Sequence, residues 1–164
     1  MRGQAGAPLG DASPYRFAVV VAQFNAFVTE PLRDAAVAAL HEAGAGRDRV
    51  DVFDVPGAFE IPQAARAAAA SGRYDAVVCL GCLIRGATAH FEYIASAAAH
   101  GIMAASADTG VPMAFGVLTT DTAEQARERA GDGPDNKGRE AAAAAIAMAG
   151  LFRTLRSPAP GARA

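Results

Sequence analysis

Short apolar runs rich in β-branched residues alternate along this chain with stretches of helical periodicity. The runs that predict buried strands are residues 16–23, 50–55, 76–84 and 111–118. The segments between them have room for helices of ~10–15 residues, and such alternation is typical of βαβ units. Parallel strands in such units are covered by helices on both faces. We therefore expect an α/β fold, a three-layer α/β/α sandwich around a four-stranded parallel sheet.

The helix boundaries are predicted from capping residues and helix breakers. Thr29 and Pro31 suit the N-cap and the first turn of a helix after the first strand. Asp121 and Glu124 have the capping-box spacing that predicts a short helix after the fourth strand. The other helices are expected at residues 61–70, 90–107 and 139–154.

The composition supports one folded domain. Hydrophobic residues make up 52% of the chain and charged residues 20%, which is enough apolar surface to bury a core. No linker or internal repeat interrupts the pattern of strands and helices. We expect a single domain at residues 15–154, with flexible segments at residues 1–14 and 155–164.

Charge and hydropathy exclude several classes of protein. The formal net charge is -2, whereas a nucleic-acid-binding surface normally brings an excess of basic residues. No apolar run approaches the ~20 residues of a membrane-spanning helix. The first 14 residues lack the apolar stretch of a signal peptide. We therefore expect a cytoplasmic protein that binds neither nucleic acid nor membranes.

The two cysteines, Cys79 and Cys82, have the C-x-x-C spacing that occurs in redox and metal sites. A zinc site needs four ligands, and no second cysteine pair or histidine pair accompanies them. Both cysteines lie inside the predicted strand at residues 76–84, whereas a redox motif starts a helix. We favour two small buried or pocket-lining residues over a redox pair, and we expect no metal.

Ligands of parallel α/β folds gather beyond the C-terminal ends of the strands, so the residues after each strand are the first candidates. Phe24 follows the first strand, where an aromatic ring either stacks on a flat ligand or folds back on the core. Glu60 follows the second strand, where its carboxylate either accepts hydrogen bonds from ligand hydroxyls or faces the positive end of a helix. The pattern leaves both pairs of alternatives open.

The third strand ends in a turn, Gly86-Ala87-Thr88, that opens a helix. Free N–H groups and a hydroxyl at a helix start favour phosphate binding. His90 follows this turn, and histidine exchanges protons near neutral pH; a capping or packing role is the alternative. Arg129 ends a short predicted helix, where a cation either complements the helix dipole or binds a phosphate.

These segments resemble lumazine synthases over about residues 17–151. The blocks that carry the resemblance are Gln-Phe-Asn at 23–25, Val-Pro-Gly-Ala-Phe-Glu-Ile-Pro at 55–62, Leu-Gly-Cys-Leu-Ile-Arg-Gly-Ala-Thr-Ala-His-Phe at 80–91, Phe-Gly-Val-Leu-Thr at 115–119, and Arg-Ala-Gly at 129–131 with Asn-Lys-Gly at 136–138. The resemblance implies a flavodoxin-like fold and the penultimate step of riboflavin biosynthesis. In that step 5-amino-6-(D-ribitylamino)uracil and 3,4-dihydroxy-2-butanone 4-phosphate give the lumazine, phosphate and water. Members of the family need no metal or organic cofactor.

The resemblance also implies roles for individual residues. The residues expected to contact the ribitylaminouracil are Phe24, Ala58, Phe59, Glu60, Cys82, Leu83, Ile84 and Phe115. The residues expected to bind the phosphate are Ala87, Thr88 and Arg129, and the expected proton-transfer residue is His90. The residues expected to support these are Asn25, Arg85, Gly86 and Lys137. Phe115 and Arg129 are expected to reach the site from a neighbouring subunit.

Members of the family form pentamers, pairs of pentamers or 60-subunit capsids. We therefore expect a homo-oligomer, a pentamer or a 60-mer, with its active site shared between adjacent subunits, and riboflavin synthase as a candidate partner. Residues 132–135 lack a lysine that members often carry, and Cys82 replaces a small hydroxyl or aliphatic residue. Lys137 is the only lysine among the 15 basic residues. Because it falls in a resembling block, we favour a role in the site or an interface over solubility alone.

Two alternatives have the same fold class. One is a noncatalytic shell protein that binds a flavin or pteridine or serves containment, and the presence of Thr88, His90 and Arg129 favours an enzyme over it. The other is a flavodoxin-like electron carrier, whose FMN site needs a hydroxyl-rich loop after the first strand. The loop at residues 24–27 is Phe-Asn-Ala-Phe and has no hydroxyl group.

Overall fold

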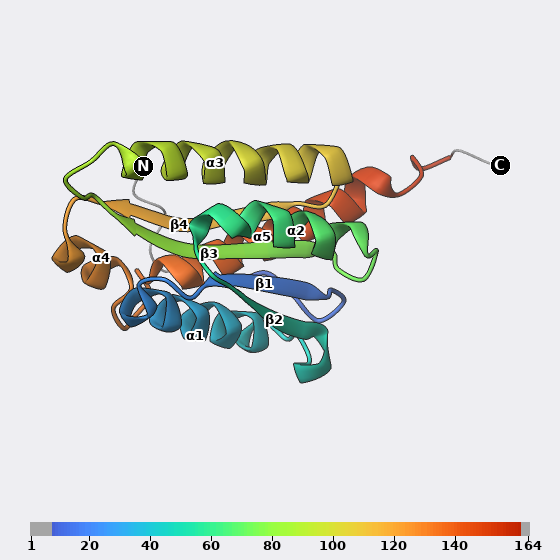
Figure 1. The fold of residues 1–164 in the computed structure, drawn as a ribbon. Helices are drawn as coiled ribbons and strands as arrows, with labels where there is room; N and C mark the ends of the chain where they lie inside the picture. The colour runs from blue at the N-terminus through green and yellow to red at the C-terminus, as the bar shows by residue number, and fades with distance from the viewer. Residues whose placement is uncertain (1–7, 162–164) are drawn as a thin grey trace.

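A parallel four-stranded sheet forms the centre of the computed structural model, which describes residues 8–161 (Figure 1). In spatial order its strands are β2 (Val50–Val55), β1 (Phe17–Ala22), β3 (Ala76–Ile84) and β4 (Met113–Thr120). The inner strand β1 is buried along its whole length, whereas the edge strand β2 has exposed residues. This difference explains why β1 reads as a continuous apolar run. The predicted α/β architecture is confirmed.

Helices cover both faces of the sheet (Figure 1). One face is covered by α1 (Ala26–Glu42) and α5 (Lys137–Arg156), and the other by α2 (Ile61–Ala70) and α3 (His90–Thr109). The short helix α4 (Ala123–Arg129) follows β4 at the C-terminal edge of the sheet. Two single-turn 3₁₀ helices, η1 (Arg47–Arg49) and η2 (Ala58–Glu60), flank β2.

The layer of α1 and α5 owes its close packing to small residues. Alanines fill the space between these helices and the sheet, among them Ala36, Ala142 and Ala145. At Gly138, a Cβ atom would collide with the backbone carbonyl of Leu32. Only glycine therefore lets the start of α5 lie this close to α1.

The prediction that the first helix starts near Pro31 is wrong. Helix α1 starts at Ala26, with Asn25 as its N-cap residue, so Pro31 lies inside the helix. The missing N–H of Pro31 removes one helical hydrogen bond near the N-terminus. The preceding turn is held by burial, because Val28 and Thr29 pack fully against the sheet. Tertiary packing thus overrides the preference of proline for a first turn.

Several other boundaries differ from the predictions by one or two residues, among them both limits of β1, β4 and α5 and the end of α3. Strand β4 begins at Met113, two residues later than expected, because Val111 and Pro112 belong to the turn after α3. The N-cap residue of α4 is Thr122 and not Asp121, since the Thr122 hydroxyl accepts a 3.2 Å hydrogen bond from the Gln125 N–H. The Gln125 side chain in turn accepts from the Asp121 N–H at 3.0 Å. The capping sequence thus starts one residue further along the chain, and Gln125 reaches back to the residue before the N-cap instead of to the N-cap itself.

The predicted segment at residues 1–14 is only partly described. Ala12 is buried, and its N–H donates a 2.8 Å hydrogen bond to the Ala43 carbonyl. Residues 1–7 and 162–164 lie outside the described residues. The flexibility of the two ends and the domain limits at residues 15–154 stay predictions. Among residues 8–161, no helix is long and apolar enough to cross a membrane.

Candidate active site

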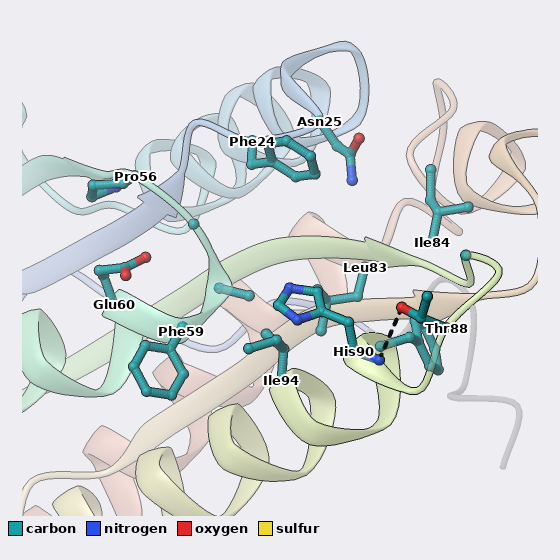
Figure 2. Close-up of a pocket in the computed structure, with 14 residues that line it drawn as sticks. Phe24, Asn25, Pro56, Phe59, Glu60, Leu83, Ile84, Thr88, His90 and Ile94 are labelled. Atoms are coloured by element: carbon teal, nitrogen blue, oxygen red, sulfur yellow. Dashed lines mark hydrogen bonds between the residues drawn. The ribbon is translucent and has the colours of Figure 1, made fainter.

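A pocket of about 570 Å³ lies at the C-terminal edge of the sheet. Its lining residues come from the segments after β1, β2 and β3 and from the first turns of α3, and are Phe24, Asn25, Pro56, Gly57, Ala58, Phe59, Glu60, Leu83, Ile84, Gly86, Thr88, His90, Phe91 and Ile94. Figure 2 shows Phe24 and Asn25 on one side of this pocket and Thr88, His90 and Ile94 on the other. The rule that ligands gather beyond parallel strands therefore predicts its position correctly.

Asn25 fixes the segment after β1 through its backbone conformation and a side-chain hydrogen bond. This residue has a φ of 61°, the only positive φ among the described non-glycine residues. Its side-chain Nδ2 donates a 2.9 Å hydrogen bond to the Cys82 carbonyl. The neighbouring Phe24 is 69% exposed, so its ring does not fold back on the core. Phe24 thus presents an aromatic face to the pocket, as a stacking platform requires.

The segment after β2 brings Glu60 to the start of α2. Glu60 is the N-cap residue of this helix, but its side chain makes no capping hydrogen bond in the described structure. Its carboxylate lies at the pocket (Figure 2) and has no capping role, which favours the alternative of bonding to ligand hydroxyls. Phe59 lies beside it and is 52% exposed.

The segment after β3 leads directly into α3. The Thr88 hydroxyl lies 3.5 Å from the His90 N–H, at the first residue of the helix (Figure 2). Ala89 is the N-cap residue and offers no side-chain acceptor, so side chains leave much of this helix start uncapped. A 20-residue helix with an uncapped N-terminus attracts an anion. Thr88 and His90 are thus placed to contact an anionic group in the pocket.

Three predicted residues of the β3 segment lie beside the pocket without lining it. Cys82 is part of β3, its side chain is buried in the core, and its carbonyl is the acceptor for Asn25. Ala87 is exposed on the turn. Arg85 is exposed, and its guanidinium forms ion pairs with Glu92 and Asp121.

Three further predicted residues lie away from this pocket. Phe115, on the edge strand β4, is 49% exposed and shares a second hollow of about 260 Å³ with Lys137. The ammonium group of Lys137 bonds to both carboxylate oxygens of Glu140 at 2.8 Å. Arg129 ends α4, and its Nη1 donates to the Gln125 carbonyl at 2.9 Å. One copy of the chain therefore does not bring Phe115, Lys137 and Arg129 into the pocket of His90.

The cysteines are free and buried, as expected. Burial raises the pKa of the Cys79 thiol to about 12 and that of Cys82 to about 11. A reactive cysteine needs the opposite shift, toward the thiolate. The two side chains also lie in the core on opposite faces of the sheet, so the C-x-x-C spacing in strand β3 does not bring the thiols together, which favours two buried residues over a redox pair.

Sequence reasoning missed Phe91 and Ile94 as pocket residues. The signal for Ile94 was available, because it lies four residues after His90 and hence on the same face of α3. Phe91 lies within a resembling block but had no individual role. Within residues 8–161, no group of three or more His, Cys, Asp and Glu side chains is arranged to hold a metal ion.

Comparison with known proteins points to one family. The family profile for 6,7-dimethyl-8-ribityllumazine synthase matches residues 14–153. A 6,7-dimethyl-8-ribityllumazine synthase of Syntrophus aciditrophicus (strain SB) is 51% identical over 144 residues, which cover 88% of this chain and 94% of the relative. The matched segment contains every residue that lines the pocket.

Proposed function

The chain belongs to the 6,7-dimethyl-8-ribityllumazine synthase family and is a transferase of riboflavin biosynthesis, and from this premise we propose that the pocket of Phe24 and His90 is its active site. In this pocket 5-amino-6-(D-ribitylamino)uracil condenses with 3,4-dihydroxy-2-butanone 4-phosphate. The observation that supports the assignment is the convergence of Phe24, Glu60 and His90, from three strand ends, on one pocket.

The residue types fit the two substrates. The exposed ring of Phe24 stacks on the pyrimidine, while Ala58, Phe59 and Glu60 hold the ribityl chain. Leu83 and Ile84 line the uracil end of the pocket, and Cys82 acts there through its backbone, since its side chain is buried.

The phosphate is proposed to bind at the turn that contains Thr88 and at the N-terminus of α3. Gly86 and Ala87 shape this turn. Arg129 of a neighbouring copy supplies the fixed positive charge, because Arg129 does not line the pocket within one chain.

The reaction begins when the ring amine attacks the ketone, and the resulting carbinolamine loses water to form an imine. Phosphate then leaves by elimination, and the resulting enol becomes a ketone. The ribitylamino nitrogen attacks this carbonyl, and loss of a second water closes the ring. His90 moves protons in the dehydration and elimination steps, while the phosphate site stabilises the departing anion. Much of the rate comes from holding two substrates in one orientation.

The same proposal accounts for the residues that lie outside the pocket. The half-exposed Phe115 and the partly buried Lys137 form a second group on the β4 side of the chain. Met103 and Met148 share another hollow with Phe115 and expose further apolar surface. In a homo-oligomer, a pentamer or a 60-mer, this group completes the pocket of the adjacent copy. Riboflavin synthase, which uses the product, is the candidate partner of such an assembly.

The cell compartment is proposed to be the cytoplasm. Cys79 and Cys82 are both free thiols, which suits a reducing compartment.

The experiment that tests the function mixes the purified protein with both substrates. We expect a fluorescent lumazine to appear together with one equivalent of inorganic phosphate, and sedimentation to show a particle of five or more chains. Binding of a flavin or pteridine without any turnover would support the noncatalytic alternative and overturn the proposal.

A further inference from the structure

Arg85 occupies a position that the substrate contacts proposed above do not use. It is the first residue after β3, and its own N–H donates a 2.8 Å hydrogen bond to the carbonyl of Thr120 at the end of β4. Its Nε donates to Oδ1 of Asp121 at 2.8 Å, and its Nη1 forms an ion pair with the Glu92 carboxylate. One side chain thus connects the end of β3, the end of β4 and the first turn of α3.

The guanidinium is also packed from the side. Its central carbon lies 4.6 Å from the centre of the Phe91 ring, and Phe91 lines the pocket. A planar guanidinium can stack on a ring and bond to two carboxylates at the same time, which an ammonium cannot do. The geometry therefore uses features that belong to arginine and not to positive charge alone.

The turn that Arg85 precedes has little other support. Residues 85–90 are all exposed, and a Cβ atom at Gly86 would meet nothing within 4 Å. Because packing restrains this segment weakly, polar contacts at its two ends decide its position. Beside the backbone bond from Arg85 to Thr120, the side-chain contacts to Asp121 and Glu92 join those ends to β4 and α3.

The charge balance argues against Arg85 as a phosphate ligand. Its single positive charge already faces the negative charges of Glu92 and Asp121. Their proximity raises the pKa of Arg85 further, so it remains charged. A phosphate that approached this guanidinium would meet two carboxylates, and it would have to displace one of them to bond there.

We propose that Arg85 is a positioning residue, which clamps the turn at residues 86–89 between Asp121 and Glu92 and so sets Thr88 and His90 against the phosphate of the substrate. This proposal rests on the active site proposed above and gives Arg85, which the resemblance names only as a supporting residue, a specific role that does not involve touching the substrate.

The test compares Arg85→Gln with Asp121→Asn. A positioning role and a phosphate-binding role of Arg85 predict opposite changes in KM for the butanone phosphate when Asp121 is replaced. If Arg85 positions the turn, both variants break the same clamp. Each then raises KM for the butanone phosphate and lowers kcat, by about three- to tenfold, while KM for the ribitylaminouracil stays unchanged. If Arg85 binds phosphate, Asp121→Asn frees the guanidinium and lowers KM for the butanone phosphate, and that result would overturn the proposal.

The matched control is Arg66→Gln, which removes a comparable exposed ion pair, that of Arg66 with Asp108 at 2.6 Å. Both residues lie outside the pocket. We expect this variant to keep both KM values. A general loss of folded protein would lower the apparent kcat alone, and so differs from the selective rise in one KM.

Hydrogen exchange gives a second readout that does not depend on turnover. We expect amides of the peptide at residues 85–97 to exchange faster in Arg85→Gln and Asp121→Asn than in the parent protein or in Arg66→Gln. Unchanged exchange in this peptide would contradict the positioning role, even if the enzyme is active. If the parent protein makes no lumazine but the two variants still exchange faster than it does, the proposed function is refuted and the structural role of Arg85 stands.

Discussion

The side-chain amide of Asn25 donates a 2.9 Å hydrogen bond to the carbonyl of Cys82, and this bond joins the segment after β1 to the end of β3. The backbone of Asn25 has a left-handed conformation, with a φ of 61°. The residue before it, Phe24, is the exposed aromatic of the pocket. A locally unfavourable backbone is thus held in place directly beside the proposed stacking platform.

Substitutions of Asn25 should separate the backbone effect from the hydrogen bond. Asn25→Gly keeps the left-handed conformation and loses the bond, which we expect to lower the free energy of unfolding by ~1 kcal/mol. Asn25→Ala also loses the bond, but it keeps the Cβ atom and lacks the short polar side chain that lets asparagine tolerate this conformation, so we expect a loss of ~2–3 kcal/mol. Urea unfolding at one fixed protein concentration measures both. Equal stability of the two variants would mean that the backbone conformation costs nothing.

The contact between α1 and α5 depends on the absence of a side chain at residue 138. A Cβ atom there would collide with the Leu32 carbonyl, so we expect Gly138→Ala to destabilise the protein by ~1–3 kcal/mol. Gly150 lies in the same helix, and the nearest atom to a Cβ there is the Tyr15 hydroxyl at 3.6 Å. Gly150→Ala should therefore be neutral or stabilising by up to ~1 kcal/mol. Thermal unfolding of the two variants checks the contrast, and equal midpoints would contradict it.

His90 is expected to speed turnover without being indispensable. Loss of a general acid–base group typically slows a reaction by about 10²–10⁴-fold. We expect His90→Ala to reduce kcat by about 10²-fold, at the small end of this range. Product should still form, because the pocket continues to orient both substrates. The control is His100→Ala, since His100 lies exposed on the same helix and bonds to the Ser96 carbonyl at 2.8 Å. If His90→Ala kept full activity, His90 would not be the proton-transfer residue.

The buried thiols predict a dependence of stability on alkaline pH. The pKa of Cys79 is raised by burial to about 12, from 9.0 in an exposed thiol, so the unfolded chain releases this proton at lower pH than the folded chain. The stabilisation is therefore complete below about pH 9 and declines as the pH rises toward about 12, by up to ~1.4 kcal/mol per pH unit. Urea unfolding of the reduced protein at several pH values, compared with Cys79→Ala, isolates this contribution. Identical slopes for both proteins would contradict it.

Much of the fold was predictable because strand and helix patterns differ in period. The limits of β2 and β3 and those of α2 agree with the predicted ranges. The start of α1 was not predictable from Pro31, since the burial of Val28 and Thr29 decides it and burial depends on the rest of the fold. The same holds for β4, whose first residues are set by the turn after α3.

The position of the site was also predictable, because parallel strands bring their C-terminal ends together. Phe24, Glu60 and His90 are far apart in the sequence but line one pocket. The sequence resemblance suggested that Phe115 and Arg129 act from another copy, and no spacing along the chain distinguishes that arrangement from one within a single copy. The clamp around Arg85 was not predictable, since the spacing along the chain does not say which acidic side chains this long guanidinium reaches.

We propose that the pocket of one copy is completed by Arg129 of the next, and co-assembly of two variants tests this arrangement most directly. His90→Ala and Arg129→Ala chains are unfolded, mixed in equal amounts and refolded together, and lumazine formation is compared with each variant refolded alone. Sites that take His90 from one chain and Arg129 from the other are fully intact, so we expect the mixture to recover about a quarter of the parent activity. A mixture no more active than the mean of the two variants would show that no site combines residues of two chains and would contradict the claim.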